Sequence, residues 1–260
     1  GRIDRDQITV EAAESELQVR AGRVRAGLPM HAEVKLPLEE VKGKKEWKDL
    51  PKKFMEALHL VVFSCSVDMS IPLLTCVHIS GKIVESSDNI RLARYELDKP
   101  VTAGSDPLLI PGSSVKELVS TSLRSPVKRI ARSSDPSGWV HFLTEEGTIF
   151  SCRLFEGEYP DPSPFLEVRG SKITLPSAMR KILNRAEVFT RVLKTQLHPL
   201  DKNVEIELRP RRFIIRAQSD SGWFEESAPT KYEGSPVAFS INPSFLRQMC
   251  KTMTTSTLGK

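Results

Sequence analysis

The side chains that most often carry catalysis or bind metals are scattered along this 260-residue chain. Its five histidines share no ligand spacing, and its four cysteines form no Cys-x-x-Cys pair. These residues are His31, His59, His78, His141 and His198, and Cys65, Cys76, Cys152 and Cys250. The sequence also lacks a nucleophile elbow, a Walker-type loop and a His-Glu-x-x-His motif. We therefore expect no catalytic residue, no metal site, no cofactor and four buried thiols.

Asp88, in the stretch Ser-Ser-Asp-Asn-Ile-Arg-Leu, is the carboxylate with the clearest local setting. It could act as a general base, but an aspartate in such a stretch usually accepts hydrogen bonds from the backbone of its own turn. We predict the turn role. A hydrolase assembled from residues without any local motif is the alternative class of function, and it requires titratable groups that lie close to one another.

Basic residues follow a more regular pattern, because they recur on or beside four predicted amphipathic helices, opposite the apolar stripe. On a single helix this pattern indicates an ordinary solvated face, whereas four equivalent helices would gather the cations on one surface. The nine residues are Lys52, Lys53, Lys116, Arg124, Arg180, Lys181, Arg185, Arg247 and Lys251. Such a surface could contact DNA phosphates without reading bases. The net charge of +5 permits this function but does not establish it.

The four helices share one design, in which a proline precedes an apolar stripe. The segments begin at Leu50, Ile110, Leu175 and Ile241, and their prolines recur at a nearly constant interval, as in repeated structural units. In the second segment Ser113 or Ser114 is expected to cap the helix. In the fourth, we expect Phe245, Leu246 and Met249 on the buried side and Arg247, Gln248 and Lys251 on the exposed side.

Short segments with alternating apolar and polar residues follow the first three helices and predict strands. They cover residues 73–79, 82–86, 90–97, 127–133, 138–144, 148–155, 204–208, 212–218 and 222–228. Three further strands are expected at 7–11, 16–20 and 23–28, and Glu146-Gly147 is expected to form a hairpin turn. The pattern predicts an α+β fold built from repeated units of one helix and about three strands.

Four stretches of the chain resemble the bacterial replication sliding clamps, the beta subunits of DNA polymerase III. They are SSDNIRLARYEL (86–97), LLIPGSSVKELV (108–119), VHFLTEEGTIFSCRLFEGEYPD (140–161) and PSAMRKILNRAEVF (176–189). The third stretch is the most specific, because no general fold rule demands a hairpin that ends in Arg-Leu-Phe-Glu-Gly-Glu-Tyr-Pro-Asp. The resemblance extends in register over nearly the whole chain.

The resemblance implies a DNA-clamp fold, with helices on the inner face of a ring and antiparallel sheets outside. It also implies an accessory protein of DNA polymerase, a processivity factor with no catalysis of its own. The expected partners are double-stranded DNA threaded through the ring, DNA polymerase, an ATP-driven clamp loader, other clamp-motif proteins and further copies of the chain. No membrane partner is expected, since no apolar run approaches a bilayer span, and the expected location is the cytoplasm, associated with the nucleoid. A sequence-independent DNA-binding protein of β-rich fold, without a ring, is the alternative.

Carried over position by position, the partner-peptide pocket of that family falls on eight residues of this chain. They are Leu74, Ser87, Asn89, Ile90, Arg91, Leu92, Pro160 and Phe165. The apolar members could form a floor for a peptide that contains Leu or Phe, with a hydrogen-bond donor on Arg91 at the rim. The chain departs from the family at Asn89-Ile90, where Gly-His or Gly-Tyr is usual. For Leu74 and Leu92, plain core packing is the alternative role.

The resemblance divides the chain into three parts: terminal strands of a first clamp domain with a linker (1–45), a complete clamp domain (46–161), and a clamp domain that lacks its final strands (162–260). A proline-rich linker begins near Tyr159. We expect a fragment of a longer, three-domain clamp that forms a homodimeric ring. In the alternative, a trimeric ring, the strand with Leu17 and Val19 completes the sheet that holds Phe213 and Ile215.

Overall fold

The computed structural model describes residues 8–13, 15–30, 41, 45–102, 107–133, 138–167, 170–190, 202–220, 222–251 and 255–259. His31 and His198 lie outside the described residues. The chain divides into two compact units, Gly1–Lys45 and Glu46–Lys260. The three-part division expected from the sequence stays a prediction.

The first unit contains one antiparallel sheet of three strands in the order β1-β2-β3. The strands are β1 (Thr9–Ala12), β2 (Glu16–Ala21) and β3 (Val24–Pro29). Leu17 and Val19, on β2, pair with Ala12 and Val10 on one side and with β3 on the other. That this strand completes the sheet of Phe213 and Ile215 stays a prediction.

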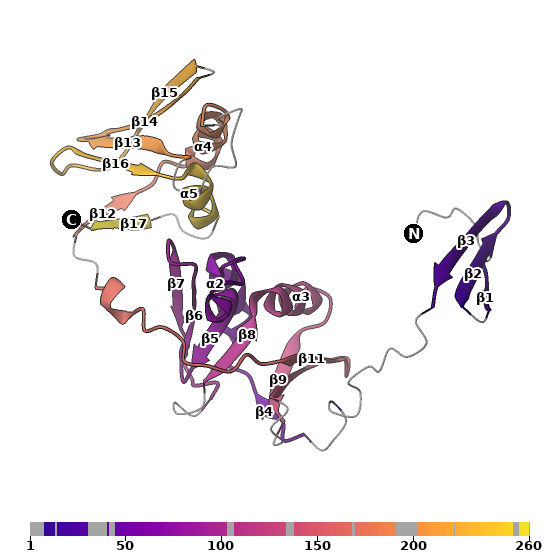
Figure 1. The fold of residues 1–260 in the computed structure, drawn as a ribbon. Helices are drawn as coiled ribbons and strands as arrows, with labels where there is room; N and C mark the ends of the chain where they lie inside the picture. The colour runs from indigo at the N-terminus through magenta and orange to yellow at the C-terminus, as the bar shows by residue number, and fades with distance from the viewer. Residues whose placement is uncertain are drawn as a thin grey trace. The chain divides into compact units, whose positions relative to one another are not determined.

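The first half of the second unit contains two four-stranded antiparallel sheets, ordered β7-β6-β5-β8 and β11-β10-β9-β4 (Figure 1). The strands of the first sheet are β5 (Cys76–Ser80), β6 (Ile83–Ser87), β7 (Leu92–Glu96) and β8 (Leu108–Pro111). Those of the second are β4 (Lys48–Asp49), β9 (Val127–Arg132), β10 (Trp139–Thr144) and β11 (Ile149–Arg153). The predicted hairpin turn joins β10 to β11, and Gly147 takes the positive φ of 86° that glycine tolerates best.

Helices α2 (Phe54–Val61) and α3 (Gly112–Ser122) pack beside each other and share one hydrophobic core with both sheets. Phe54 of α2 stacks on Phe142 of β10 with ring centroids 6.1 Å apart. Gly112 permits the close approach of α3, because a Cβ there would lie 2.9 Å from the carbonyl oxygen of Thr75 and 3.0 Å from Cys65 Sγ. A 3₁₀ turn, η1 (Val62–Ser64), extends α2.

The remainder of the second unit has its own core, formed by helices α4 (Met179–Val188) and α5 (Pro243–Met249) against the sheet β15-β14-β13-β16. Its strands are β13 (Val204–Arg209), β14 (Arg212–Ser219), β15 (Gly222–Pro229) and β16 (Val237–Ile241). The stripe predicted for α4 is confirmed, since Met179, Ile182, Leu183 and Ala186 are all buried. The short turn η3 (Ser163–Phe165) lies in the proline-rich segment before strand β12 (Gly170–Thr174).

Three expectations about local structure are wrong. Residues 73–75 belong to a 3₁₀ turn, η2 (Pro72–Thr75), because Pro72 has no N–H to donate to a strand ladder. Ser113 and Ser114 do not cap α3, because β8 runs directly into the helix and Pro111 occupies the N-cap position. A strand does follow the fourth helix: β17 (Thr255–Gly259) pairs with β12 (Gly170–Thr174).

Candidate functional site

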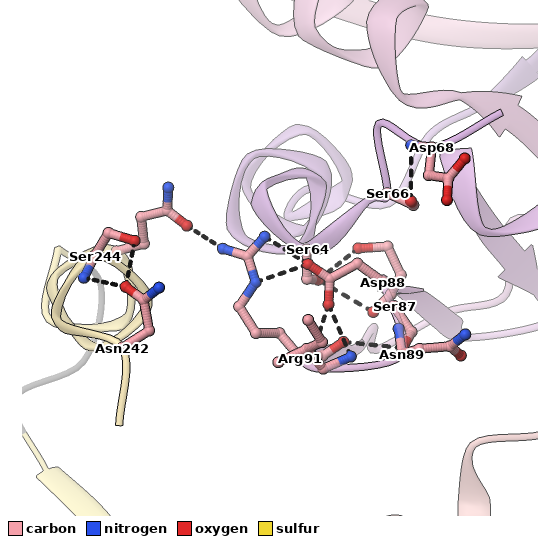
Figure 2. Close-up of polar contacts among 12 residues, drawn as sticks. Ser64, Ser66, Asp68, Ser87, Asp88, Asn89, Arg91, Asn242 and Ser244 are labelled. Carbon is pink, nitrogen blue, oxygen red and sulfur yellow. Dashed lines mark hydrogen bonds and ion pairs between the residues drawn. The ribbon is translucent and has the colours of Figure 1, made fainter. Parts of the chain in front are cut away.

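The turn between β6 and β7 holds the centre of the predicted pocket, and Asp88 organises it (Figure 2). Asp88 Oδ1 accepts hydrogen bonds from the backbone N–H groups of Ile90, at 3.1 Å, and Arg91, at 2.7 Å. Ser87 Oγ donates to the carbonyl oxygen of Arg91 at 2.9 Å. The turn role predicted for Asp88 is thus confirmed.

Asn89 occupies the position where the clamps that the sequence resembles usually have glycine, and its backbone conformation is one that glycine favours. Its φ is 68°, in the left-handed region that glycine enters freely and that asparagine tolerates better than most residues. The turn therefore keeps a conformation suited to glycine although its residue is not glycine. Ile90, the second departure, is 40% exposed beside it.

Arg91 is held on several sides, and its side chain is only 11% exposed. Its Nε and Nη2 donate to Asp88 Oδ2 at 2.9 and 2.6 Å, and its Nη1 donates to Gln248 Oε1 of α5 (Figure 2). The guanidinium carbon lies 4.2 Å from the ring centroid of Phe245 and 5.7 Å from that of Phe63. Within the described part of the chain these bonds use three of its five N–H groups, so two could still donate to a ligand.

Helix α5 thus contributes to this region in a way that the sequence reasoning missed. Gln248 was expected on the exposed side of the fourth helix, yet it accepts the hydrogen bond from Arg91 and is half-buried. Phe245 was expected in the core, yet it is half-buried against the guanidinium. Asn242 caps the helix, because its Oδ1 accepts a hydrogen bond from the Ser244 N–H at 2.9 Å (Figure 2).

A groove of about 220 Å³ brings together all eight residues predicted for the pocket, from three separate stretches of the chain. Its lining consists of Leu74, Ser87, Asn89, Ile90, Arg91, Leu92, Tyr159, Pro160, Asp161, Pro162 and Phe165. Within the groove, Leu74 is buried at 4%, whereas Phe165 is 79% exposed. Leu74 therefore has both roles considered for it, since it packs in a small core and also lines the groove. Whether the groove binds a peptide stays a prediction.

Tyr159, Asp161 and Pro162 also line the groove, and the sequence reasoning did not assign them to it. Burial raises the pKa of the Tyr159 hydroxyl above its ordinary value. The pKa of Asp161 is lowered, because its carboxylate accepts hydrogen bonds from the Ser163 hydroxyl and from the Ser163 N–H at 2.9 Å. Both residues stand in the Tyr-Pro-Asp motif that carried the resemblance, and that motif was the available signal.

The nine predicted DNA-facing cations lie on or next to helices that pack in pairs, α2 with α3 and α4 with α5. All are exposed except Arg247, which is half-buried. Lys52 and Lys53 precede α2, Lys116 lies on α3, and Arg124 follows it. Arg180, Lys181 and Arg185 lie on α4, Arg247 lies on α5, and Lys251 follows it.

Two of these cations are engaged within the chain. Arg185 forms two hydrogen bonds to the carboxylate of Glu226, at 2.8 and 2.6 Å. Arg247 pairs with Glu187 and donates to Asn184 Oδ1 at 3.1 Å, which joins α5 to α4. The other seven cations form no ion pair within the described residues, so their charges are left for a ligand; Arg180, Lys181 and Lys251 are the three of them on or next to α4 and α5.

The described residues contain no cluster of His, Cys, Asp and Glu that could hold a metal ion. Cys65, Cys76 and Cys152 are buried, as expected, but Cys250 is only half-buried. Burial raises the pKa of the Cys65 thiol to about 11 and that of Cys152 to about 12. Within the described part of the chain, no helix is long and apolar enough to cross a membrane.

Comparison with known proteins places the fold. No protein-family model matches the sequence. Among solved structures, the chain is similar to the DNA polymerase III beta chain of Streptococcus pneumoniae, with a TM-score of 0.71 and 18% identity over 98% of this chain and 68% of that chain. It is also similar to the DNA polymerase sliding clamp of Pseudomonas aeruginosa (TM-score 0.67, 19% identity, 95% and 68%).

A third similar structure is the sliding clamp, DNA polymerase III subunit beta, of Bartonella birtlesii, solved with bound griselimycin (TM-score 0.73, 16% identity, 95% and 68%). The α+β clamp fold expected from the sequence is thus confirmed. At these identities the likeness establishes the fold, and function has to be argued from the groove and the basic helices.

Proposed function

We propose that the protein is a DNA sliding clamp, a processivity factor that encircles duplex DNA and tethers DNA polymerase and other replication or repair proteins. The observation that carries this proposal is the groove, in which residues from three distant stretches meet around one small apolar cavity. A clamp needs such a site, because the polymerase must be held by a surface that does not itself touch the DNA. The clamp fold of similar solved structures supports the same function.

The groove suits a short peptide with apolar side chains. Apolar contact area comes from Leu74, Leu92 and Pro160. A bound ligand could also cover the exposed ring of Phe165. Apolar anchors in a concave site usually supply most of the affinity, while a few polar groups fix orientation. The two remaining N–H groups of Arg91 would supply that orientation by donating to peptide carbonyl oxygens.

The helices suit contact with DNA that is independent of sequence. Exposed lysine and arginine side chains at the four helices would meet phosphates, and such contacts carry no base information. Each contact contributes little alone and is screened by salt. A protein held only by these contacts would leave DNA quickly, so retention would depend on a closed ring, formed with further copies of the chain and opened by a clamp loader.

Retention on DNA of different topology tests this proposal. The protein is loaded by a bacterial clamp loader with ATP onto a nicked circular plasmid, and half of the sample is then linearised. A ring should stay on the circle at about 0.5 M NaCl and leave the linear DNA by sliding off its ends. A β-rich protein that binds DNA without a ring would instead leave both forms equally as salt rises, which would overturn the proposal.

A further inference from the structure

A buried carboxylate lies behind the groove. Glu85, on β6, is 2% exposed, and its two oxygens have different partners on the neighbouring strands. His78 Nδ1, on β5, lies 2.8 Å from Oε1, and Arg94 Nε, on β7, donates to Oε2 at 2.7 Å. The strand register places the three residues in one row across the sheet, because Glu85 pairs with His78 on one side and with Arg94 on the other.

This row is connected to the wall of the groove at two points. The His78 ring stacks on Tyr159, with centroids 4.7 Å apart and planes inclined by 15°. Tyr159 lines the groove and directly precedes Pro160. On the other side of Pro160, the pKa of Asp161 is lowered mainly by its hydrogen bonds with Ser163 and further by the charge of Arg94. One carboxylate thus binds both His78, on which Tyr159 stacks, and Arg94, whose charge acts on Asp161.

Burial of a charged group is costly unless partners satisfy it, and an apolar row could fill the same space. Unlike an apolar side chain, the Glu85 carboxylate can orient its neighbour, because the hydrogen bond between His78 Nδ1 and Glu85 Oε1 fixes the rotation of the His78 ring. The plane of that ring in turn fixes the plane of Tyr159. The wall segment itself contains Pro160, Pro162 and Pro164, which have no N–H to donate. The backbone hydrogen bonds that Phe165 and Leu166 donate, to Pro162 and Ser163, are local to η3, so side-chain contacts such as that of Tyr159 help to hold the segment against the sheet.

We propose that Glu85 and His78 are positioning residues for the groove, which hold the Tyr159 ring and with it the wall from Pro160 to Phe165. The inference rests on the proposed function, since it concerns the same groove. Neither residue lines the groove. Their effect on a ligand therefore passes through Tyr159.

Fluorine NMR on the full chain labelled with 3-fluorotyrosine tests this inference. The chain has three tyrosines, Tyr95, Tyr159 and Tyr232, and the variant Tyr159→Phe assigns the Tyr159 resonance. In Glu85→Gln, which keeps the size of the side chain, the Tyr159 resonance should shift or broaden while that of Tyr232 stays in place. The affinity for a fluorescent synthetic peptide ending in Leu-Phe should fall about fivefold. Glu205→Gln, at a side chain that is 52% exposed, is the matched control and should change neither quantity.

A second variant distinguishes two roles of His78: holding the Tyr159 ring, and donating a hydrogen bond to the buried Glu85 carboxylate. His78→Asn keeps an N–H donor for Glu85 but removes the ring on which Tyr159 stacks, so it should reproduce the NMR change and the loss of affinity. An unmoved Tyr159 resonance in both variants overturns the inference, as does unchanged peptide affinity in a variant whose resonance has moved. If the wild-type protein binds no peptide, the proposed function fails on that result. The inference is then judged on the Tyr159 resonance alone.

Discussion

Gln248, on α5, accepts a hydrogen bond from Nη1 of Arg91, a residue 157 positions earlier in the chain that also lines the groove. The same guanidinium lies over the ring of Phe245, one turn before Gln248. The side chain of Arg91 therefore contacts both the groove and helix α5, which carries Arg247 and is followed by Lys251, two of the predicted DNA-facing cations. A change in one set can affect the other through this single charged group.

The first prediction concerns this contact. Gln248→Ala should lower the free energy of unfolding by about 1–2 kcal/mol, because it removes a partly buried hydrogen bond to a charged donor. A double-mutant cycle with Arg91→Ala, measured by urea unfolding, should give a coupling energy of about 1 kcal/mol. Lys251→Ala, just beyond the same helix, serves as the control and should not couple to Arg91. Coupling below about 0.3 kcal/mol would show that the two residues act independently.

The second prediction concerns Phe165, a largely exposed aromatic residue of the groove. Phe165→Ala should weaken binding of a peptide ending in Leu-Phe by about 1–2 kcal/mol, as expected for an aromatic anchor. Because the ring is 79% exposed, the melting temperature should hardly change. Leu123→Ala, at a residue that is 84% exposed and outside the groove, is the matched control. Full affinity in the Phe165 variant would place the peptide elsewhere.

The third prediction concerns the basic helices. Reversing Arg180, Lys181 and Lys251 together to glutamate should weaken DNA binding and flatten the slope of log K against log salt, by roughly 0.9 for each phosphate that the variant no longer neutralises. The control reverses Lys82, Lys99 and Arg153, which are exposed residues on or next to strands, with the same change in net charge. Equal effects of the two triple variants would indicate that net charge matters and that the helix faces do not.

The fourth prediction concerns pH. The folded state raises the pKa of the Cys65 thiol to about 11, so it holds the proton more tightly than the unfolded chain does. The corresponding stability is complete below the unfolded pKa, near 9, and is lost as pH rises toward 11. Between about pH 8 and pH 10.5, the fall in the free energy of unfolding should be smaller in Cys65→Ala than in the wild type, by roughly 1–2 kcal/mol. Parallel curves would contradict the assignment.

Much of the fold could be predicted from the sequence, because it depends on periodicity within short segments. The four residues of the apolar stripe of α4, Met179, Ile182, Leu183 and Ala186, recur at helical spacing and are buried. The alternating residues of β13 and β14 likewise mark strands whose inward side chains, such as Ile206 and Phe213, are buried. Each helix or strand must bury one face, and the spacing of its apolar residues along the sequence indicates which face that is. The eight groove residues were also predictable, from local motifs of a known family.

Tertiary structure alone decided features that arise where distant segments meet. The strand β12 has no strong pattern of its own, and it forms because β17 supplies its hydrogen-bond partners about 85 residues later. Helical spacing predicted an exposed Gln248 on α5, and it could not indicate that Arg91 lies beside this residue and leaves it half-buried. Glu85 looked like one more strand residue, and only the packing of β5, β7 and Tyr159 around it makes it a buried charge. Sequence patterns report which face of an element is hidden, whereas the identity of the neighbour is a property of the packed chain.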